Sequence, residues 1–276
     1  MLRRTAIVAA AIAVALGGCS SADDDAAATT TTELATTTTA AIEPLTILVT
    51  NDDGISHPGI DTLVAALQEL DAVEVVVVAP ATNQTGMSDR TTPGGASYAD
   101  GTTASGVEGT AVDGTPADTI AVALDDLGIE PDLVVSGINQ GQNLGPVAFQ
   151  SGTLGAARAA VRRGIPAIGG SAGIPEDTDY DAVAALVVDH ITEHRSEYAD
   201  GTADVTSVVS FNIPYCSAGD IQELVEAPLA PTIAQGENPY DTDCTVVSDA
   251  APADDVEAVM TGHAVLTLVP PEAPPE

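Results

Sequence analysis

Two adjacent carboxylates follow the first apolar run of the globular part of the chain. Asp52 and Asp53 come directly after Leu45–Thr50, within the sequence Asn-Asp-Asp-Gly. Neighbouring carboxylates repel each other, and a fold keeps such a pair mainly where a cation lies between them. The alternative is an acidic loop that water solvates. These two residues therefore predict a site for a divalent cation.

Two further polar loops are expected beside this pair. The apolar run Val73–Ala79 predicts a second parallel strand, and Thr85 lies in the loop of hydroxyl and amide side chains that follows it. The run Pro131–Ser136 predicts another buried strand, and the loop after it carries Asn139 and Asn143 among three glycines. Ligands in open α/β sheets bind beyond the carboxyl ends of the strands. Amide and hydroxyl oxygens at that edge could complete the coordination of a hard cation.

An anion site is predicted at the start of a later helix. Ser151-Gly152-Thr153 begins a helical pattern that ends at about Arg163. Backbone N–H groups at a helix start attract anions, and the two hydroxyls add further donors. A cation beside such a helix start suits a phosphate ester, because the cation can orient or ionise water for in-line attack. Together these residues predict hydrolysis of a phosphate ester.

Alternating strand and helix patterns predict the elements that position these residues. They indicate an α/β fold with three αβα layers and a Rossmann-like, mostly parallel sheet, followed by a C-terminal excursion or hairpin. Residues 90–107 show no clear periodicity and are predicted to be irregular or weak strand. The other predicted helices run over residues 58–70, 116–127 and 178–194, and the other strands over residues 164–169, 205–211 and 263–269.

The charge and composition of the chain exclude several classes of partner. Acidic residues number 41 and basic residues 7, all of them arginine, which gives a net charge of −34. Binding of a nucleic-acid polymer or of anionic lipid needs basic clusters that this chain lacks. Aromatic residues make up only 3%. The core is therefore expected to consist of Val, Ala, Leu and Ile, which suits parallel strands alternating with helices.

The start of the chain has the pattern of a secretion signal. Arg3 and Arg4 precede an apolar run from Thr5 to Leu16 that is too short to span a bilayer. The run closes on Leu-Gly-Gly-Cys, which resembles the lipobox of bacterial lipoproteins. That resemblance implies cleavage before Cys19 and a lipid on its thiol. The alternative is an ordinary secretory signal with an incidental cysteine.

The composition after Cys19 divides the chain into parts. Residues 1–18 are expected to be a lipoprotein signal peptide. Residues 19–44 are rich in threonine and alanine and too poor in large apolar residues to fold, which predicts a disordered tether. Residues 45–272 are expected to form one domain. The mature protein is then expected outside the cytoplasmic membrane, attached to it only by its lipid anchor.

Two cysteines lie late in the domain. In an oxidising compartment, Cys216 and Cys244 could form a disulfide, and two free thiols are the alternative. Their spacing does not decide between the two. No histidine cluster lies beside them in the sequence, so a zinc site is not expected.

Five motifs follow one another along the domain. They are Ile47–Gly54 with Pro58–Ile60, Ala79-Pro80 with Asn83 and Gly86, Gly114–Asp118, Pro131–Asn139 with Gly141 and Asn143–Gly145, and Ser151–Thr153. In this order they resemble the survival protein SurE family, and the similarity runs from about Leu45 to Phe211, with a weaker similarity at His263–Val269. The resemblance implies that residues 45–272 form a metal-dependent acid phosphatase, which removes phosphate from nucleoside 5′- or 3′-monophosphates or other phosphomonoesters.

The resemblance also implies roles for individual residues. One divalent metal, most simply Mg²⁺ or Mn²⁺, would be held by Asp52, Asp53, Thr85 and Asn139. The phosphate would be held by Asn143, Ser151, Gly152 and Thr153. The residues that would act in the reaction are Asp52, which would position or activate the attacking water, Asn143 and Ser151.

The chain departs from the family pattern at several places. Thr85 stands where the family usually has serine, and residues 81–84 lack the basic side chains that relatives often carry there. His57 lies one place later than the family's histidine and is predicted to be a surface residue at a helix start. After Phe211 the family's oligomerisation arm is rearranged or shortened, so a homodimer is left as an open alternative.

Two other functions are consistent with parts of the sequence. The missing basic residues suit a nucleotide- or phosphate-binding lipoprotein that has lost turnover. Gly169–Gly173 matches the serine-esterase pattern Gly-x-Ser-x-Gly, with Ser171 as the nucleophile. Pro175 and the acidic residues after it give no helix directly behind this serine, which disfavours the esterase. The sequence does not settle the base, the preference for 5′ or 3′ esters, or the identity of the metal.

Overall fold

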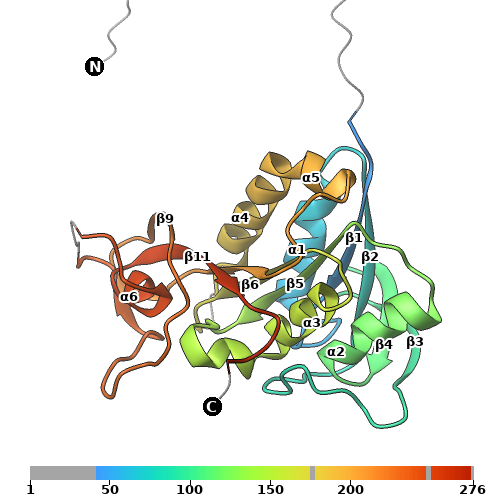
Figure 1. Ribbon diagram of the computed structural model, residues 1–276, viewed down its shortest axis with the longest axis horizontal. Coiled ribbons are helices and arrows are strands. Elements are labelled where there is room, and N and C mark those ends of the chain that lie inside the picture. Colours follow the sequence, from blue (N-terminus) through green and yellow to red (C-terminus); the bar gives the residue numbers. More distant parts are fainter. Residues whose placement is uncertain (1–41, 175–177, 247–249, 275–276) are drawn as a thin grey trace, which may run out of the picture. The chain divides into compact units, whose positions relative to one another are not determined.

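A computed structural model describes residues 42–174, 178–246 and 250–274 of the protein (Figure 1). The predicted signal peptide, the predicted lipidation site Cys19 and the predicted tether up to residue 41 lie outside the described residues. Among the helices that are described, none combines the length and the apolar character needed to cross a membrane.

Nine strands of the described chain form one mixed sheet in the order β3-β4-β2-β1-β5-β6-β7-β11-β9. The six strands from β4 to β7 in this order are parallel, whereas β3 and β11 run antiparallel to their neighbours β4 and β7. The bounds are β1 (Leu45–Thr50), β2 (Val73–Pro80), β3 (Ser97–Thr102), β4 (Glu108–Asp113), β5 (Leu133–Gln140), β6 (Ala167–Ala172), β7 (Val208–Asn212), β9 (Gln222–Glu226) and β11 (His263–Val269).

Helices cover both faces of this sheet, which confirms the predicted three-layer α/β fold. On one face, α1 (Pro58–Gln68), α4 (Tyr180–Glu193) and α5 (Arg195–Ala199) share one hydrophobic cluster with Ile47 and Val49 of β1. On the other face, Leu48 packs with α3 (Gly152–Val161) and with α2 (Pro116–Ala121), which continues as a π-helical turn over Val122–Asp126. Successive residues of a strand point to opposite faces, so a strand covered on both sides is apolar throughout.

The structure defines one element that the sequence left as irregular or weak strand, and it extends another. Residues 97–102 form the regular strand β3, which pairs with β4 along six residues. Its side chains are mostly exposed, so β3 shows no apolar pattern, and only the pairing with β4 defines it. Strand β5 also runs on to Gln140, with an irregular register against β6 between Ser136 and Asn139. Asn139 therefore lies on the end of a strand and not in the loop after it.

The predicted excursion after β7 lies only partly outside the main sheet. A separate parallel pair is formed by β8 (Cys216–Ala218) and β10 (Thr242–Asp243), whereas β9 joins the main sheet beside β11. The short helix α6 (Asp255–Met260) precedes β11. Asp255 at its first position accepts hydrogen bonds from the backbone N–H groups of Gly145 (2.9 Å) and Ala230 (2.8 Å). This buried carboxylate therefore ties the C-terminal segment to the end of the loop after β5.

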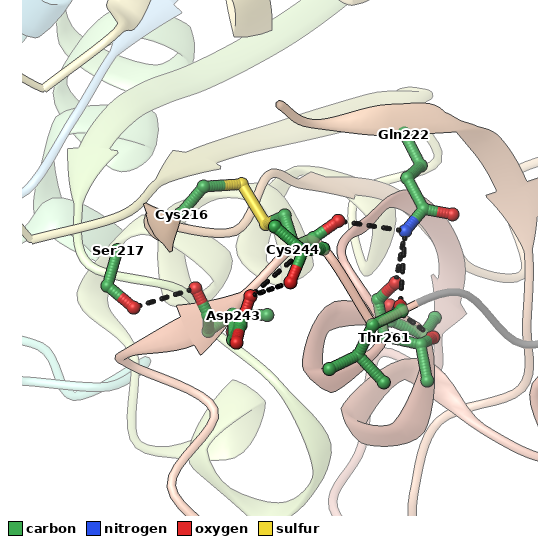
Figure 2. The surroundings of a disulfide bond; sticks show 10 residues. Cys216, Ser217, Gln222, Asp243, Cys244 and Thr261 are labelled. Atoms are coloured by element: carbon green, nitrogen blue, oxygen red, sulfur yellow. Dashed lines mark hydrogen bonds between the residues drawn. A yellow bond between two sulfur atoms is a disulfide. The ribbon is translucent and has the colours of Figure 1, made fainter. Parts of the chain in front are cut away.

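Cys216 and Cys244 form a disulfide, which resolves the alternative that the sequence left open. Their Cα atoms lie 5.4 Å apart, and the bond joins β8 to the residue after β10. Figure 2 shows Gln222 beside it, where the side-chain Nε2 donates to the carbonyl oxygens of Thr261 (2.8 Å) and Cys244 (3.4 Å). The disulfide and Gln222 together hold three separate segments of the C-terminal region.

Replacing both cysteines by serine should lower the free energy of unfolding by about 3 to 4 kcal/mol. The two residues are 28 apart in the sequence, and a cross-link over a loop of this length restricts the unfolded chain by roughly that amount. Urea denaturation with and without dithiothreitol measures the loss. The double variant should not respond to reductant, and an equally unresponsive wild type would contradict a stabilising disulfide.

Candidate active site

Asp52 lies buried at the carboxyl end of β1, the central strand of the parallel part of the sheet. Its residue is 2% exposed, and its Oδ1 accepts a hydrogen bond from Thr153 Oγ1 at the start of α3. Burial raises the pKa of Asp52 to about 6, and the hydrogen bond from Thr153 acts against this while the charge of Asp53 adds to it. A carboxylate held at such a cost is stabilised by a nearby cation, which would lower its pKa again.

Asp53 is the residue on which several loops converge. Its Oδ1 accepts a hydrogen bond from Asn83 Nδ2 at 2.9 Å and lies 3.5 Å from Thr85 Oγ1. Its Oδ2 accepts the backbone N–H of Gln140 at 3.3 Å. Of the predicted ligands, Thr85 therefore lies beside this carboxylate, and the residue after Asn139 bonds to it.

The turn after Asp53 is fixed by its own residues. Asn51 donates from Nδ2 to the carbonyl of Gly54 (2.9 Å) and accepts the Gly54 N–H at Oδ1 (3.2 Å). Gly54 has a φ of +105°, which a residue with a side chain rarely adopts. The N–H of Gln84 also donates to the carbonyl of Asp52 at 2.6 Å. The Asn-Asp-Asp-Gly sequence therefore sets the direction of both carboxylates and attaches the loop after β2.

Asn139 presents an oxygen that suits a cation. Its Nδ2 donates to the carbonyl of Gly141 at 2.6 Å, which leaves Oδ1 as the amide oxygen available to a ligand. With Asp52, Asp53 and Thr85, the donors are two carboxylates, a hydroxyl and an amide oxygen, a set that fits Mg²⁺ or Mn²⁺. The described residues hold no group of three or more His, Cys, Asp or Glu side chains arranged for a metal. A cation here would therefore depend on neutral oxygens besides the two aspartates.

The start of α3 lies directly against Asp52. Ser151 caps the helix by accepting the N–H of Leu154 at 3.1 Å. A Cβ atom on Gly152 would lie 2.7 Å from Asp52 Cβ and 3.0 Å from Pro116 Cγ. Only a glycine lets this helix start approach the carboxylate so closely. The predicted cation ligands and the predicted anion site are thus adjacent.

The Gly114–Asp118 motif supports the site from behind. Thr115 and Asp118 form a capping box at the start of α2, in which each side chain bonds to the backbone of the other residue. Burial acts to raise the pKa of Asp118, but hydrogen bonds from Thr92 and Thr115 outweigh it, so the pKa lies below its usual value. Pro116 of this helix packs on Gly152.

Asn143 points partly away from the predicted phosphate site. Its Nδ2 donates to Ser171 Oγ at 2.9 Å, and its backbone N–H donates to Asn212 Oδ1 at 2.7 Å. All three residues are buried. One N–H of the Asn143 amide is therefore occupied by Ser171, and its other N–H remains for a ligand.

This arrangement argues against Ser171 as an esterase nucleophile. Ser171 is fully buried within β6, and its hydroxyl oxygen accepts the Asn143 amide. A nucleophile elbow needs an exposed serine on a sharp turn between strand and helix. The structure therefore does not favour the esterase interpretation of the Gly169–Gly173 pattern.

The predictions from the sequence missed some residues at the site and described others differently. Asn212 carries a signal that could have found it, an amide at the end of a buried strand, whereas Gln140 acts through its backbone and leaves none. His57 does start a helix, as predicted, because its Nδ1 accepts the Gly59 N–H at 3.1 Å. That nitrogen also lies 3.8 Å from Asp53 Oδ2, and without a proton on it the contact is no salt bridge.

Comparison with known proteins finds one family throughout. Residues 47–235 match the family model "Survival protein SurE". A 5'-nucleotidase SurE of Halobacterium salinarum is 40% identical over 186 residues, which are 65% of this chain and 69% of the relative. One from Methanocella arvoryzae is 32% identical over 232 residues, which are 77% of this chain and 86% of the relative. The crystal structure of the SurE protein from Aquifex aeolicus superposes with a TM-score of 0.64 at 27% identity, covering 83% of this chain and 94% of that one.

Proposed function

The chain belongs to the survival protein SurE family, and we propose that it is a divalent-metal-dependent phosphomonoesterase acting on nucleoside 5′- or 3′-monophosphates. The observation that carries this proposal is the contact between the start of α3 and Asp52. A helix start with free backbone N–H groups lies against Asp52, the first of the two adjacent carboxylates, which supports a cation and a phosphate side by side. The names of the relatives as 5'-nucleotidases support the same activity.

One group of residues would bind the metal and another would bind the phosphate. One divalent metal, Mg²⁺ or Mn²⁺, would be held by Asp52, Asp53, Thr85 and Asn139. When bound, it would neutralise phosphate charge and lower the pKa of a water molecule. Residues 151–153 offer the free N–H groups of a helix start to the phosphate oxygens.

Asp52 would position the attacking water and accept its proton. The hydrogen bond from Thr153 fixes the orientation of this carboxylate. Asn143 and Ser151 would orient the phosphate, with Asn143 held by Ser171 and Asn212.

The loop over residues 81–84 has no basic side chain. The phosphate charge is therefore left to the metal and to backbone N–H groups, and a low substrate affinity is expected. This feature is also what supports the second candidate, a binding lipoprotein of the same fold without turnover.

Release of phosphate from a panel of nucleoside 5′- and 3′-monophosphates, with Mn²⁺, with Mg²⁺ and with EDTA, tests the proposal. Turnover should appear with metal, vanish in EDTA and return when metal is added back. Nucleotide binding in calorimetry without any release of phosphate would select the binding lipoprotein instead.

The location and the assembly of the protein are part of the proposal. We propose that it is anchored outside the cytoplasmic membrane through a lipid on Cys19. The disulfide supports this, because disulfides persist in oxidising compartments. Partition into detergent, lost in Cys19→Ala, checks the anchor. A homodimer is checked by light scattering, and the exposed side chains of Leu224 and Leu268 near the edge of the sheet support it.

A further inference from the structure

Arg158 is a buried cation in a chain that has few cations. The protein has seven arginines and no lysine, and the side chain of Arg158 in α3 is 2% exposed. Burial of a guanidinium is costly and is tolerated only with good partners. The Nε of Arg158 has no hydrogen-bond partner among the described residues. The contacts of its other nitrogens must therefore offset the cost of burying the charge.

Those contacts join two loops at the site. Arg158 Nη2 lies 3.2 Å from Ser88 Oγ and 3.3 Å from the carbonyl oxygen of Phe149, and Ser88 Oγ itself donates to that carbonyl at 2.6 Å. The same nitrogen is 3.7 Å from Asp89 Oδ2, and the guanidinium lies 5.4 Å from the centre of the Phe149 ring. Ser88 is three residues after Thr85, and Phe149 is two residues before Ser151. One guanidinium thus bonds to both chain segments that carry predicted ligands.

The face of α3 that bears Arg158 is shaped for these loops. Gly152, Gly155 and Arg158 recur every third residue, which places them on neighbouring turns of one side of the helix. A Cβ on Gly155 would lie 2.0 Å from the carbonyl oxygen of Ser88, so the loop backbone rests directly on the helix. Thus Gly152 leaves room for Asp52, and Gly155 leaves room for the loop after β2. Arg158 bonds to that same loop.

We propose that Arg158 is a positioning residue that holds the Thr85 loop, residues 81–90, in register with the helix start at Ser151. The inference rests on the proposed function, since it assigns Thr85 to the metal. Arg158 acts through Ser88, Asp89 and Phe149, and it does not touch the substrate. The helix start keeps its own cap and its contact with Asp52 without Arg158. Loss of Arg158 therefore loosens the metal side of the site more than the phosphate side.

The test compares Arg158→Met, Arg158→Lys and the control Arg163→Met. Methionine keeps an unbranched apolar stem but removes the donors, whereas lysine keeps a charge and can bond to Ser88. Arg163 lies on the same helix region but pairs only with Asp125 on the surface, at 2.9 Å for each of two contacts. Asp89→Asn weakens the contact between Arg158 and the Thr85 loop from the loop side. This variant replaces Arg158→Met in the test if Arg158→Met does not fold.

The first readout is hydrogen exchange in the metal-free protein. Exchange over residues 82–90 should rise about tenfold in Arg158→Met while residues 152–160 stay protected, because only the loop loses its partner. The second readout is manganese binding followed by electron paramagnetic resonance, and the affinity should weaken about tenfold. The third is turnover, in which kcat should fall about tenfold with KM changed less than threefold. Lysine should recover most of each loss, and Arg163→Met should show none.

Two results would overturn the inference. The first is that Arg158→Met and wild type show the same hydrogen exchange in the Thr85 loop and the same affinity for manganese. The other is equal loosening of the loop and of all of α3, which would mean a general loss of stability. Failure of the proposed function looks different, because wild type itself would then release no phosphate while the loop in Arg158→Met would still loosen.

Discussion

Asp52→Asn should lower kcat for nucleoside monophosphates by roughly a thousandfold while the metal-free protein stays fully folded. Asparagine has almost the same shape as aspartate and its oxygen can still accept the hydrogen bond from Thr153. It cannot accept a proton from water, and it removes one of the two negative charges offered to the metal. Loss of a general base and of a metal ligand each costs about 10² or more in rate.

The same substitution should not reduce stability in EDTA. Asp52 is buried, and its pKa is raised to about 6, because the protein interior disfavours the charged form. At pH 7 the metal-free wild type therefore carries a buried charge at a cost in free energy, and asparagine removes that charge. The midpoint of thermal unfolding in EDTA should be equal to or above that of wild type.

Asp61→Asn is the matched control for this experiment. Asp61 is a half-buried carboxylate on α1 that accepts hydrogen bonds from the backbone and hydroxyl of Ser105, away from the site. The same change there should leave kcat unaltered. If Asp52→Asn kept full activity with Mn²⁺, or if it unfolded in EDTA, the role assigned to Asp52 would be wrong.

The sequence indicated the carboxyl edge of the sheet because its signals there are local. Asp52 and Asp53 follow a strand rich in apolar and β-branched residues, and Ser151 starts a helix with a cap that the residue type itself predicts. Each of these signals depends on neighbours in the chain. Once the strands are parallel, their ends meet at one edge without further information.

What the sequence could not show depends on residues far apart in the chain. The partner of Cys216 is 28 residues away, and the spacing alone was compatible with either a disulfide or two free thiols. Strand β3 is exposed and is defined only by pairing with β4. The hydrogen bond from the Asn143 amide to Ser171, 28 residues later in the chain, has no signal in the sequence either. Such contacts follow from packing, which no local pattern contains.

Helix α3 links four of the five motifs. Its first turn contacts Asp52 through Thr153, and Gly152 packs on Pro116 of the motif that starts α2. Its second turn carries Gly155 against the loop that bears Thr85. The predicted metal ligands come from three separate segments, and this helix contacts two of them directly. A change on its packing face should therefore act on both the metal side and the phosphate side of the site.

Gly152→Ala should lower kcat about a hundredfold or more, even though it adds a single methyl group. The new Cβ would lie 2.7 Å from Asp52 Cβ, 2.8 Å from Asp52 Oδ2 and 3.0 Å from Pro116 Cγ. These atoms belong to short side chains in a packed region, so the helix start must move away from the carboxylate. A displacement of about 1 Å at reacting groups can cost about 10² in rate.

The cost in stability should be small beside the loss of activity. Overpacking of a buried contact destabilises by about 1 to 3 kcal/mol, and the better helix propensity of alanine offsets part of it. Ala159→Ser, which adds one atom to a partly exposed position of the same helix, is the control and should keep its activity. Activity and urea denaturation are measured on both variants. Wild-type kcat in Gly152→Ala would show that the close approach of α3 to Asp52 is not needed, because the reaction would then tolerate a helix start displaced from the carboxylate.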